Sequence, residues 1–187
     1  EKTLAKYKNS RYDKGTILFG FHQAKAHMRP KSRAIVVEGY LDALSLWQQG
    51  FQETVACQGT ALTIKQISLL GGAAPLVYLM FDGDQAGEKA ALRALEHSFQ
   101  FPQVHFKVVS LPQGEDPDSF VRAKGPDQLE KLLGESSDLL DFAIRKRLSR
   151  VAEQGLPQVI KKEILPWVRE VQDPIRQAFL LQKTEGV

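Results

Sequence analysis

The sequence of 187 residues has one cysteine, no long apolar run and no methionine at its start. A single cysteine, Cys57, excludes an internal disulfide framework and a cysteine-type zinc site within these residues. No apolar stretch approaches the roughly 20 residues that cross a bilayer. The opening "EKTLAKYKNS" also lacks the apolar centre of a signal peptide. We therefore expect a cytoplasmic protein without membrane contact, and the missing initiator methionine indicates a piece of a longer chain.

The remaining composition is that of a globular protein, with 43% hydrophobic and 25% charged residues. The formal net charge of +3 permits nucleic-acid binding without arguing for it. Basic residues gather in the first 33 positions, so the N-terminal segment is the basic part of the chain. The four histidines show no metal-ligand spacing, and we expect Trp47 and Trp167 to pack in the core or at an interface.

Short apolar runs alternate with segments of helical spacing between residues 33 and 111. The runs expected as strands are "RAIVVEG", "TVACQ", "APLVYLMFD" and "VHFKVVSL". The segments expected as helices are "YLDALSLWQQG", "LTIKQISLLGG" with Thr63 as its N-cap, and "QAGEKAALRALEHSF". Strands that alternate with helices predict parallel pairing and right-handed crossovers. We predict an α/β fold: a parallel sheet of about four strands flanked by helices, followed by an α-helical subdomain.

The strand signal ends before residue 126. The segments expected as tail helices are "PDQLEKLLGES", "SSDLLDFAIRKRLSRVAEQ", "LPQVIKKEILPWVREVQ" and "DPIRQAFLLQKTE". We expect Ser136 or Ser137 to cap one helix, Pro166 to kink or split another, and Asp173 with Pro174 to start the last. The basic stretch "IRKRLSR" is expected as a solvated helix face, with an approach to nucleic acid as the alternative.

Acidic residues follow three of the predicted strands. They are Glu38 with Asp42 one helical turn later, Asp82 and Asp84 in "DGD", and Asp116 and Asp118 in "EDPD". Ligands in an open parallel sheet gather beyond the carboxyl ends of the strands, so all of these acids could converge. Each motif alone has a plainer interpretation as a helix cap or a turn. Their joint placement favours one acidic site.

An acidic cluster of this kind calls for a cation. Neighbouring carboxylates raise one another's pKa values, and Mg²⁺ or Mn²⁺ removes that penalty because both ions prefer oxygen ligands. Such ions orient phosphates and stabilise charge during phosphoryl transfer. Gly39 and Gly83 lack a Cβ atom, so we expect backbone there to pass close to a metal or a phosphate.

The order of four motifs resembles one family. "VVEGYLDALSLWQQGF", "VACQGTA", "YLMFDGDQAGEKAALRALE" and "LPQGEDPDSFVRAKG" resemble the catalytic core of bacterial DnaG-type primases, which carry the TOPRIM fold and make RNA primers for replication. "KYKNSRYDKGTILFG" and "DPIRQAFLLQ" resemble the segments before and after that core. The resemblance implies a remnant of a basic N-terminal subdomain and linker at 1–33, a TOPRIM metal-binding domain at 34–125 and a helical subdomain at 126–187.

The resemblance also implies roles for individual residues. The catalytic residues would be Glu38, Asp82 and Asp84. The ligands of Mg²⁺ or Mn²⁺ would be Glu38, Asp42, Asp82, Asp84, Asp116 and Asp118. The nucleotide and nucleic-acid contacts would be Lys6, Asn9, Lys14, Gly59 and Thr60.

The implied activity is that of a nucleotidyltransferase, a DNA-dependent RNA polymerase that builds primers from NTPs on single-stranded DNA. Its implied partners are the template, the NTPs, the RNA primer and a replicative helicase, reached through a C-terminal domain absent here. No zinc-binding domain is present either, so the isolated piece is expected to have little activity. Two alternatives stay open: another TOPRIM enzyme, either a metal-dependent nuclease or a topoisomerase fragment, and a fragment that binds metal and nucleotide without activity.

Overall fold

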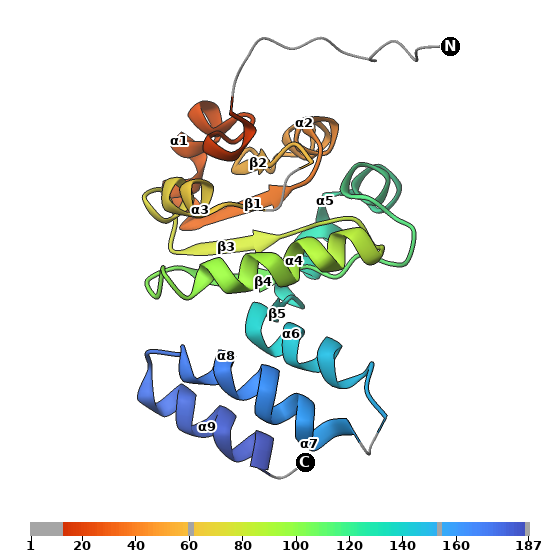
Figure 1. The fold of residues 1–187 in the computed structure, drawn as a ribbon. Helices are drawn as coiled ribbons and strands as arrows, with labels where there is room; N and C mark the ends of the chain where they lie inside the picture. The colour runs from red at the N-terminus through yellow and green to blue at the C-terminus, as the bar shows by residue number, and fades with distance from the viewer. Residues whose placement is uncertain (1–12, 60–61, 153–154, 186–187) are drawn as a thin grey trace, which may run out of the picture.

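A computed structural model describes residues 13–59, 62–152 and 155–185 (Figure 1). Its centre is a sheet of five strands in the order β2-β1-β3-β4-β5. The strands are β1 (Arg33–Val37), β2 (Thr54–Ala56), β3 (Leu76–Leu79), β4 (His105–Val108) and β5 (Ser137–Asp138). The first four pair in parallel, which confirms the predicted sheet, and β5 pairs with β4 antiparallel. The strand β5 was not predicted, because two residues are too few for a periodic pattern.

Helices cover both faces of this sheet, as Figure 1 shows. One face carries α1 (Phe21–Lys31), α3 (Ile64–Gly71) and α4 (Gln85–Ser98), and the other carries α2 (Tyr40–Gln48) and α5 (Pro117–Gly134). Alternate residues of β1 point to opposite faces, so Val36 packs in the first layer and Ile35 and Val37 in the second. All three are fully buried, which explains why β1 reads as a continuous apolar run.

The helix α3 also holds the chain segment before α1. Thr63 caps α3 as predicted, because its hydroxyl oxygen accepts the Gln66 N–H at 3.2 Å. The same hydroxyl donates to the Gly15 carbonyl at 2.6 Å. The fully buried Gln66 side chain donates to the carbonyls of Lys14 and Ile17 at 3.0 and 2.7 Å. The 3₁₀ turn η1 (Lys14–Thr16) is therefore fixed to the N-terminus of α3.

Two helices in the first 125 residues were not predicted. The helix α1 lies in the stretch interpreted as a linker, yet it buries Ala24 and Met28 in the core. The first stretch of α5 starts at Pro117 within the expected loop and ends at Gly125, which has φ +79°; the second stretch, which runs to Gly134, is the helix predicted from "PDQLEKLLGES". Pro117 occupies the first helical turn, where a missing N–H costs nothing. The boundaries at 33/34 and 125/126 stay predictions.

The tail is helical, as predicted, and consists of α6 (Leu139–Leu148), α7 (Leu156–Val159), the π-helical turn η3 (Ile160–Ile164), α8 (Leu165–Arg169) and α9 (Pro174–Glu185). The cap expected at Ser136 or Ser137 is wrong, because Asp138 accepts the first N–H groups of α6 and Ser137 belongs to β5. Asp173 starts α9 as predicted, accepting the N–H of Ile175 at 2.9 Å. The split at Pro166 takes the form of the π-helical turn before it.

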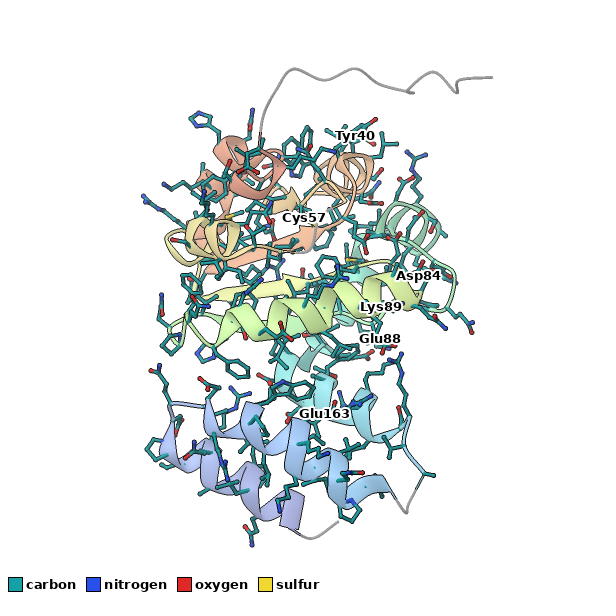
Figure 2. The ribbon with its side chains drawn as sticks, in the orientation of Figure 1. Tyr40, Cys57, Asp84, Glu88, Lys89 and Glu163 are labelled. Atoms are coloured by element: carbon teal, nitrogen blue, oxygen red, sulfur yellow. The ribbon has the colours of Figure 1, made fainter. Side chains whose placement is uncertain are left out.

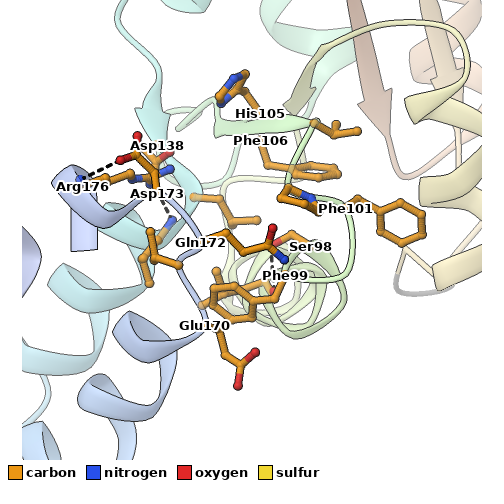
Figure 3. A pocket seen from close by; sticks show the side chains of 16 residues that line it. Ser98, Phe99, Phe101, His105, Phe106, Asp138, Glu170, Gln172, Asp173 and Arg176 are labelled. Carbon is orange, nitrogen blue, oxygen red and sulfur yellow. Dashed lines mark hydrogen bonds and ion pairs between the residues drawn. The ribbon is translucent and has the colours of Figure 1, made fainter. Parts of the chain in front are cut away.

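The tail folds back against the sheet domain. Leu139, Phe142 and Ile164 belong to the same core cluster as Ala91 and Leu95 of α4. A cavity of about 160 Å³ lies at this junction, bordered by an ion pair between Arg176 and Asp138 at 2.5 Å (Figure 3). Within the described residues, no helix is long and apolar enough to cross a bilayer.

Candidate active site

Two of the predicted site residues cap helices at the carboxyl edge of the sheet. Asp84 Oδ1 accepts the N–H groups of Ala86 and Gly87, both at 2.8 Å, at the start of α4. Asp116 Oδ1 accepts the Ser119 N–H at 2.7 Å at the start of α5. The plainer interpretation of these acids as caps is thus correct. It leaves the second carboxylate oxygen of each side chain without an assigned capping role.

Asp42 and Asp118 tie α2 to α5. The carboxylate of Asp42 accepts the Gly39 N–H at 3.0 Å and the Asp118 N–H at 3.3 Å. The Asp118 side chain accepts a hydrogen bond from the Ser45 hydroxyl and forms an ion pair with Arg122 Nε at 2.6 Å. Asp118 therefore has its charge already balanced by the protein, and it is the least suited of the acids to hold a cation.

Among the six predicted acids, Glu38 and Asp82 are the two with an orphaned oxygen. Glu38 Oε1 and Asp82 Oδ1 are buried and have no hydrogen-bond partner. A buried carboxylate oxygen without a partner is costly, and a second carboxylate nearby adds repulsion. These two positions follow β1 and β3, which are neighbours in the sheet. The centre of the acidic edge is thus the part whose charge the protein leaves unbalanced.

The pKa values show that the acids act on one another. Burial, followed by the charges of Glu38, Asp116 and Asp84, raises the pKa of Asp82 from 3.8 to about 6. Burial also raises the pKa of Asp42 from 3.8 to about 6; hydrogen bonds from Gly39 and Asp118 oppose the rise, and the charges of Asp82 and Asp116 add to it.

Glu38 responds to the same cluster. Burial raises its pKa, a hydrogen bond from the Asp82 backbone opposes the rise, and the charges of Asp84 and Asp42 add to it. The structure therefore brings five of the six predicted acids into one electrostatic cluster, with Asp118 attached through its backbone.

A divalent cation fits the chemistry of this edge. Orphaned oxygens and mutual repulsion are both relieved by a hard cation that takes oxygen ligands. Glu38 and Asp82 would hold it through these oxygens, and Asp84 through the oxygen that does not cap α4. In the described ranges, however, no three side chains of His, Cys, Asp or Glu already surround a point as metal ligands would.

Comparison with known proteins places this edge in a family. A family model described as Toprim-like matches residues 35–121. A DNA primase from Pseudomonas putida is 43% identical over 134 residues, covering 70% of this chain and 20% of that protein. A DNA primase domain from Pseudomonas aeruginosa superposes with a TM-score of 0.84 at 30% identity, covering 100% of this chain and 61% of that chain. A DnaG primase catalytic domain bound to single-stranded DNA superposes with a TM-score of 0.82 at 29% identity, covering 97% of this chain and 60% of that chain.

The chain belongs to the DnaG-type primase family. It spans 20% of the length of the Pseudomonas putida primase and 28% of an Aquifex aeolicus one. The match at 35–121 contains the whole acidic edge, from Glu38 to Asp118.

Gly83 has a different role in this primase-family site from the one expected. It was expected to give clearance to a metal or a phosphate. A Cβ atom there would instead lie 2.1 Å from the Pro112 carbonyl oxygen. The backbone of Gly83 pairs with the same loop: its N–H donates to the Glu115 carbonyl at 2.9 Å, and its carbonyl accepts the Gly114 N–H at 3.1 Å. The glycine thus lets the loop after β4 join the "DGD" turn.

Gly39 likewise makes room for protein. A Cβ atom at Gly39 would lie 2.8 Å from Asp42 Oδ2, so its absence lets that carboxylate fold over the start of α2. The Cβ atoms missing from Gly39 and Gly83 would both collide with other parts of the site, which makes both positions structural parts of the acidic edge.

The predicted nucleotide contacts are only partly described. Lys6, Asn9 and Thr60 lie outside the described residues. Lys14 is exposed in η1, with its backbone held by α3. Gly59 has φ +74° and follows β2 at the carboxyl edge, directly after Gln58, whose N–H donates to the Glu38 carbonyl at 2.8 Å. The loop containing Gly59 therefore adjoins the acidic edge, and its role in nucleotide binding stays a prediction.

The sequence interpretation missed two residues of the site. Glu115 has a buried orphaned Oε2, and Ser45 binds Asp118 across the α2–α5 contact. Glu115 could have been found from its place beside Asp116 in "GEDPD". Ser45 is one polar residue in an amphipathic helix, and its partner lies 73 positions away, so no local signal indicates it.

Proposed function

We propose that this chain is the catalytic core of a primase, which adds ribonucleotides to an RNA primer on single-stranded DNA during replication. One observation carries the proposal: the buried orphaned oxygens of Glu38 and Asp82, at the carboxyl edge of a Toprim-like sheet. The named relatives are DNA primases, and one similar solved structure is described as bound to single-stranded DNA. We extend both properties to this chain.

The acidic edge would provide the binding site for divalent metal. A bound Mg²⁺ or Mn²⁺ supplies neutralisation of phosphate charge and activation of the attacking hydroxyl. Glu38, Asp82 and Asp84 are the catalytic acids in this proposal, and Asp42 and Asp116 complete the negative potential. Asp118 braces α2 against α5 through Ser45 and Arg122.

Basic and small residues would receive the substrate. Lys14 offsets triphosphate or primer charge as a point charge. Lys6, Asn9, Gly59 and Thr60 contribute further contacts to nucleotide or nucleic acid. The helix α3 keeps η1 in one place, so that Lys14 reaches out from a fixed backbone rather than from a free tail.

The full protein's partners follow from the same proposal. NTPs and the primer occupy the acidic edge, and a replicative helicase binds a part of the parent protein outside this chain. A bacterial cytoplasmic location fits the bacterial primases that the chain resembles. A nuclease or topoisomerase activity is the less favoured alternative, because the curated relatives at 35% to 43% identity are DNA primases.

Primer extension tests the proposal. The chain is given a single-stranded template with an annealed primer, NTPs and Mg²⁺ or Mn²⁺, and product length is read on a gel. We expect extension that is lost in Asp82→Asn and kept in Asp127→Asn, an exposed position on α5. Metal-dependent cutting of the template without extension would overturn the proposal in favour of a nuclease. Metal-dependent nucleotide binding with neither reaction would limit it to a binding fragment.

A further inference from the structure

A largely buried acid on α4, Glu88, pairs with two cations from the helical tail. Glu88 has a side chain that is 13% exposed, and its carboxylate lies 3.2 Å from Lys146 Nζ and 2.7 Å from Arg150 Nη2. Arg150 and Glu88 are close but not aligned as a hydrogen bond. In Figure 2, Glu88 lies on the side of α4 that faces the tail, and Asp84 lies at the start of the helix.

These contacts account for the basic stretch "IRKRLSR". Besides the two cations on Glu88, Arg147 forms a two-pronged ion pair with Glu163, and Arg145 donates to the Ser137 hydroxyl at 2.6 Å. The stretch was expected as a solvated face. Its basic side chains are exposed to solvent, as expected, and they also pair within the protein, where they join the tail to α4, β5 and η3.

The start of α4 lacks packed support on the side of the tail. A cavity of about 360 Å³ lies there, lined by both ends of the "DGD" turn, the first turns of α4, Phe142 and Lys146. Side chains do not fill this space, so the first turn of α4 has less packing than the next turns, where Ala91 and Leu95 share a core cluster with Phe142 of α6. Glu88 and Lys146 both line the cavity, and their ion pair links α4 to α6 there, while Arg150, just beyond α6, pairs with the same carboxylate.

The same turns of α4 determine where two catalytic acids lie. The Glu88 N–H donates to the Asp84 carbonyl at 3.1 Å, and the Asp84 carboxylate accepts the N–H groups of Ala86 and Gly87. A Cβ atom at Gly87 would lie 2.2 Å from the Asp82 carbonyl oxygen, so α4 rests directly on the backbone of Asp82. A displacement of the first turn of α4 would therefore displace both Asp82 and Asp84.

We propose that Glu88, Lys146 and Arg150 form a clamp between α4 and α6, and that Glu88 is a positioning residue for the acids of the metal site. The inference rests on the proposed function, because that function makes Asp82 and Asp84 metal ligands. Through the clamp, the helical tail fixes the start of α4, which positions the "DGD" carboxylates. Mutual attraction across a partly buried boundary suits this task, since breaking one side leaves a buried charge without its partner.

The decisive measurement is the free Mn²⁺ concentration that half-saturates the chain in a binding titration. Glu88→Gln and the double variant Lys146→Gln with Arg150→Gln should both raise this midpoint, by about tenfold, the lower range for residues that orient metal ligands. Simple long-range electrostatics gives opposite signs, because loss of an acid weakens cation binding and loss of two bases strengthens it. A lower midpoint in the double variant would overturn the clamp.

Two further readouts separate positioning from a loss of folding. Lys89→Gln changes an exposed charge beside Glu88 and should leave the midpoint unchanged. The double variant with exchanged charges, Glu88→Lys with Lys146→Glu, should recover most of the Mn²⁺ affinity that Glu88→Gln loses. In metal-free protein, hydrogen exchange at the Ala86 and Gly87 amides should speed up in Glu88→Gln, and unchanged exchange would contradict the inference.

The outcome is independent of polymerase activity. If Glu88→Gln binds Mn²⁺ as the parent chain does while the parent extends primers, the clamp fails and the proposed function stands. If the parent chain binds Mn²⁺ but does not extend primers, the proposed function fails, and the midpoints still decide on the clamp. If the parent chain shows no response to Mn²⁺, both are overturned.

Discussion

Replacing Asp82 by asparagine should make the metal-free protein more stable at neutral pH. The pKa of Asp82 rises from 3.8 to about 6 on folding, mainly through burial and then through the charges of Glu38, Asp116 and Asp84. The native state therefore binds this proton more tightly than the unfolded chain does. Such a group contributes stability that is fully present below about pH 4 and is lost as the pH rises through about 6. At neutral pH the ionised Asp82 opposes folding.

The size of the effect follows from the shift. Two pKa units correspond to about 3 kcal/mol, which is an upper limit because the acids titrate together. Asp82 is partly exposed, and solvent screening reduces the effect, so we expect a gain of about 1 kcal/mol for Asp82→Asn. In a chain of this length, that corresponds to a rise in melting temperature of about 2–4 °C.

The assay is thermal or urea unfolding in excess chelator at two pH values. The variant should be more stable than the parent at about pH 7.5, and the difference should shrink towards zero at about pH 4, where native Asp82 is already protonated. Asp127→Asn serves as the control, since it removes an exposed charge away from the cluster. An Asp82→Asn variant that is less stable than the parent at neutral pH, or a gain that persists at low pH, would refute the repulsion on which the metal site rests.

Three other outcomes follow from the same structure. Adding Mn²⁺ should raise the melting temperature of the parent chain and have little effect on that of Asp82→Asn. Thermal unfolding measures both, and equal rises in the two proteins would mean that the ion binds elsewhere. Gly83→Ala should lower the free energy of unfolding by about 1–3 kcal/mol, because the added methyl group would lie 2.1 Å from the Pro112 carbonyl oxygen. Urea unfolding checks this against Gly134→Ala, where nothing lies within 4 Å of the added methyl group. Gln66→Ala should lower the free energy of unfolding by about 2–3 kcal/mol, because the carbonyls of Lys14 and Ile17 lose their donor. Limited proteolysis near η1 should become faster in this variant. Unchanged cleavage would mean that α3 does not hold the turn.

The order of strands and helices could be predicted because each of these elements has a local sequence pattern. Val36 and its neighbours in β1 are buried on both faces, and that burial produces a continuous apolar run. Thr63 and Asp173 begin helices by hydrogen bonds to residues two or three positions away. By contrast, β5 has two residues and depends on β4 for its existence. The cap at Asp138 was misassigned to its serine neighbours because serine and aspartate both favour that position.

The acidic site was predictable as a set of residues and not as an arrangement. The positions of Glu38 and Asp82 after buried strands indicate one edge of the sheet. Contacts between distant segments decide which oxygens lack a hydrogen-bond partner. Ser45 and Arg122 bind the Asp118 carboxylate, whereas Asp82 Oδ1 has no partner. The role of Gly83 also required the loop at Pro112, which lies outside the reach of any local pattern.

The division of the acids into helix caps and orphans has an evolutionary consequence. Asp84 and Asp116 stabilise α4 and α5 whether or not the protein is active, because they satisfy N–H groups of the first turns. Glu38 and Asp82 lower the stability of the metal-free fold. A duplicated gene that no longer needed catalysis would stay under selection for a capping residue at 84 and 116, and would gain stability by neutral substitutions at 38 and 82. In decayed copies of this chain, the two kinds of acid should therefore disappear at different rates.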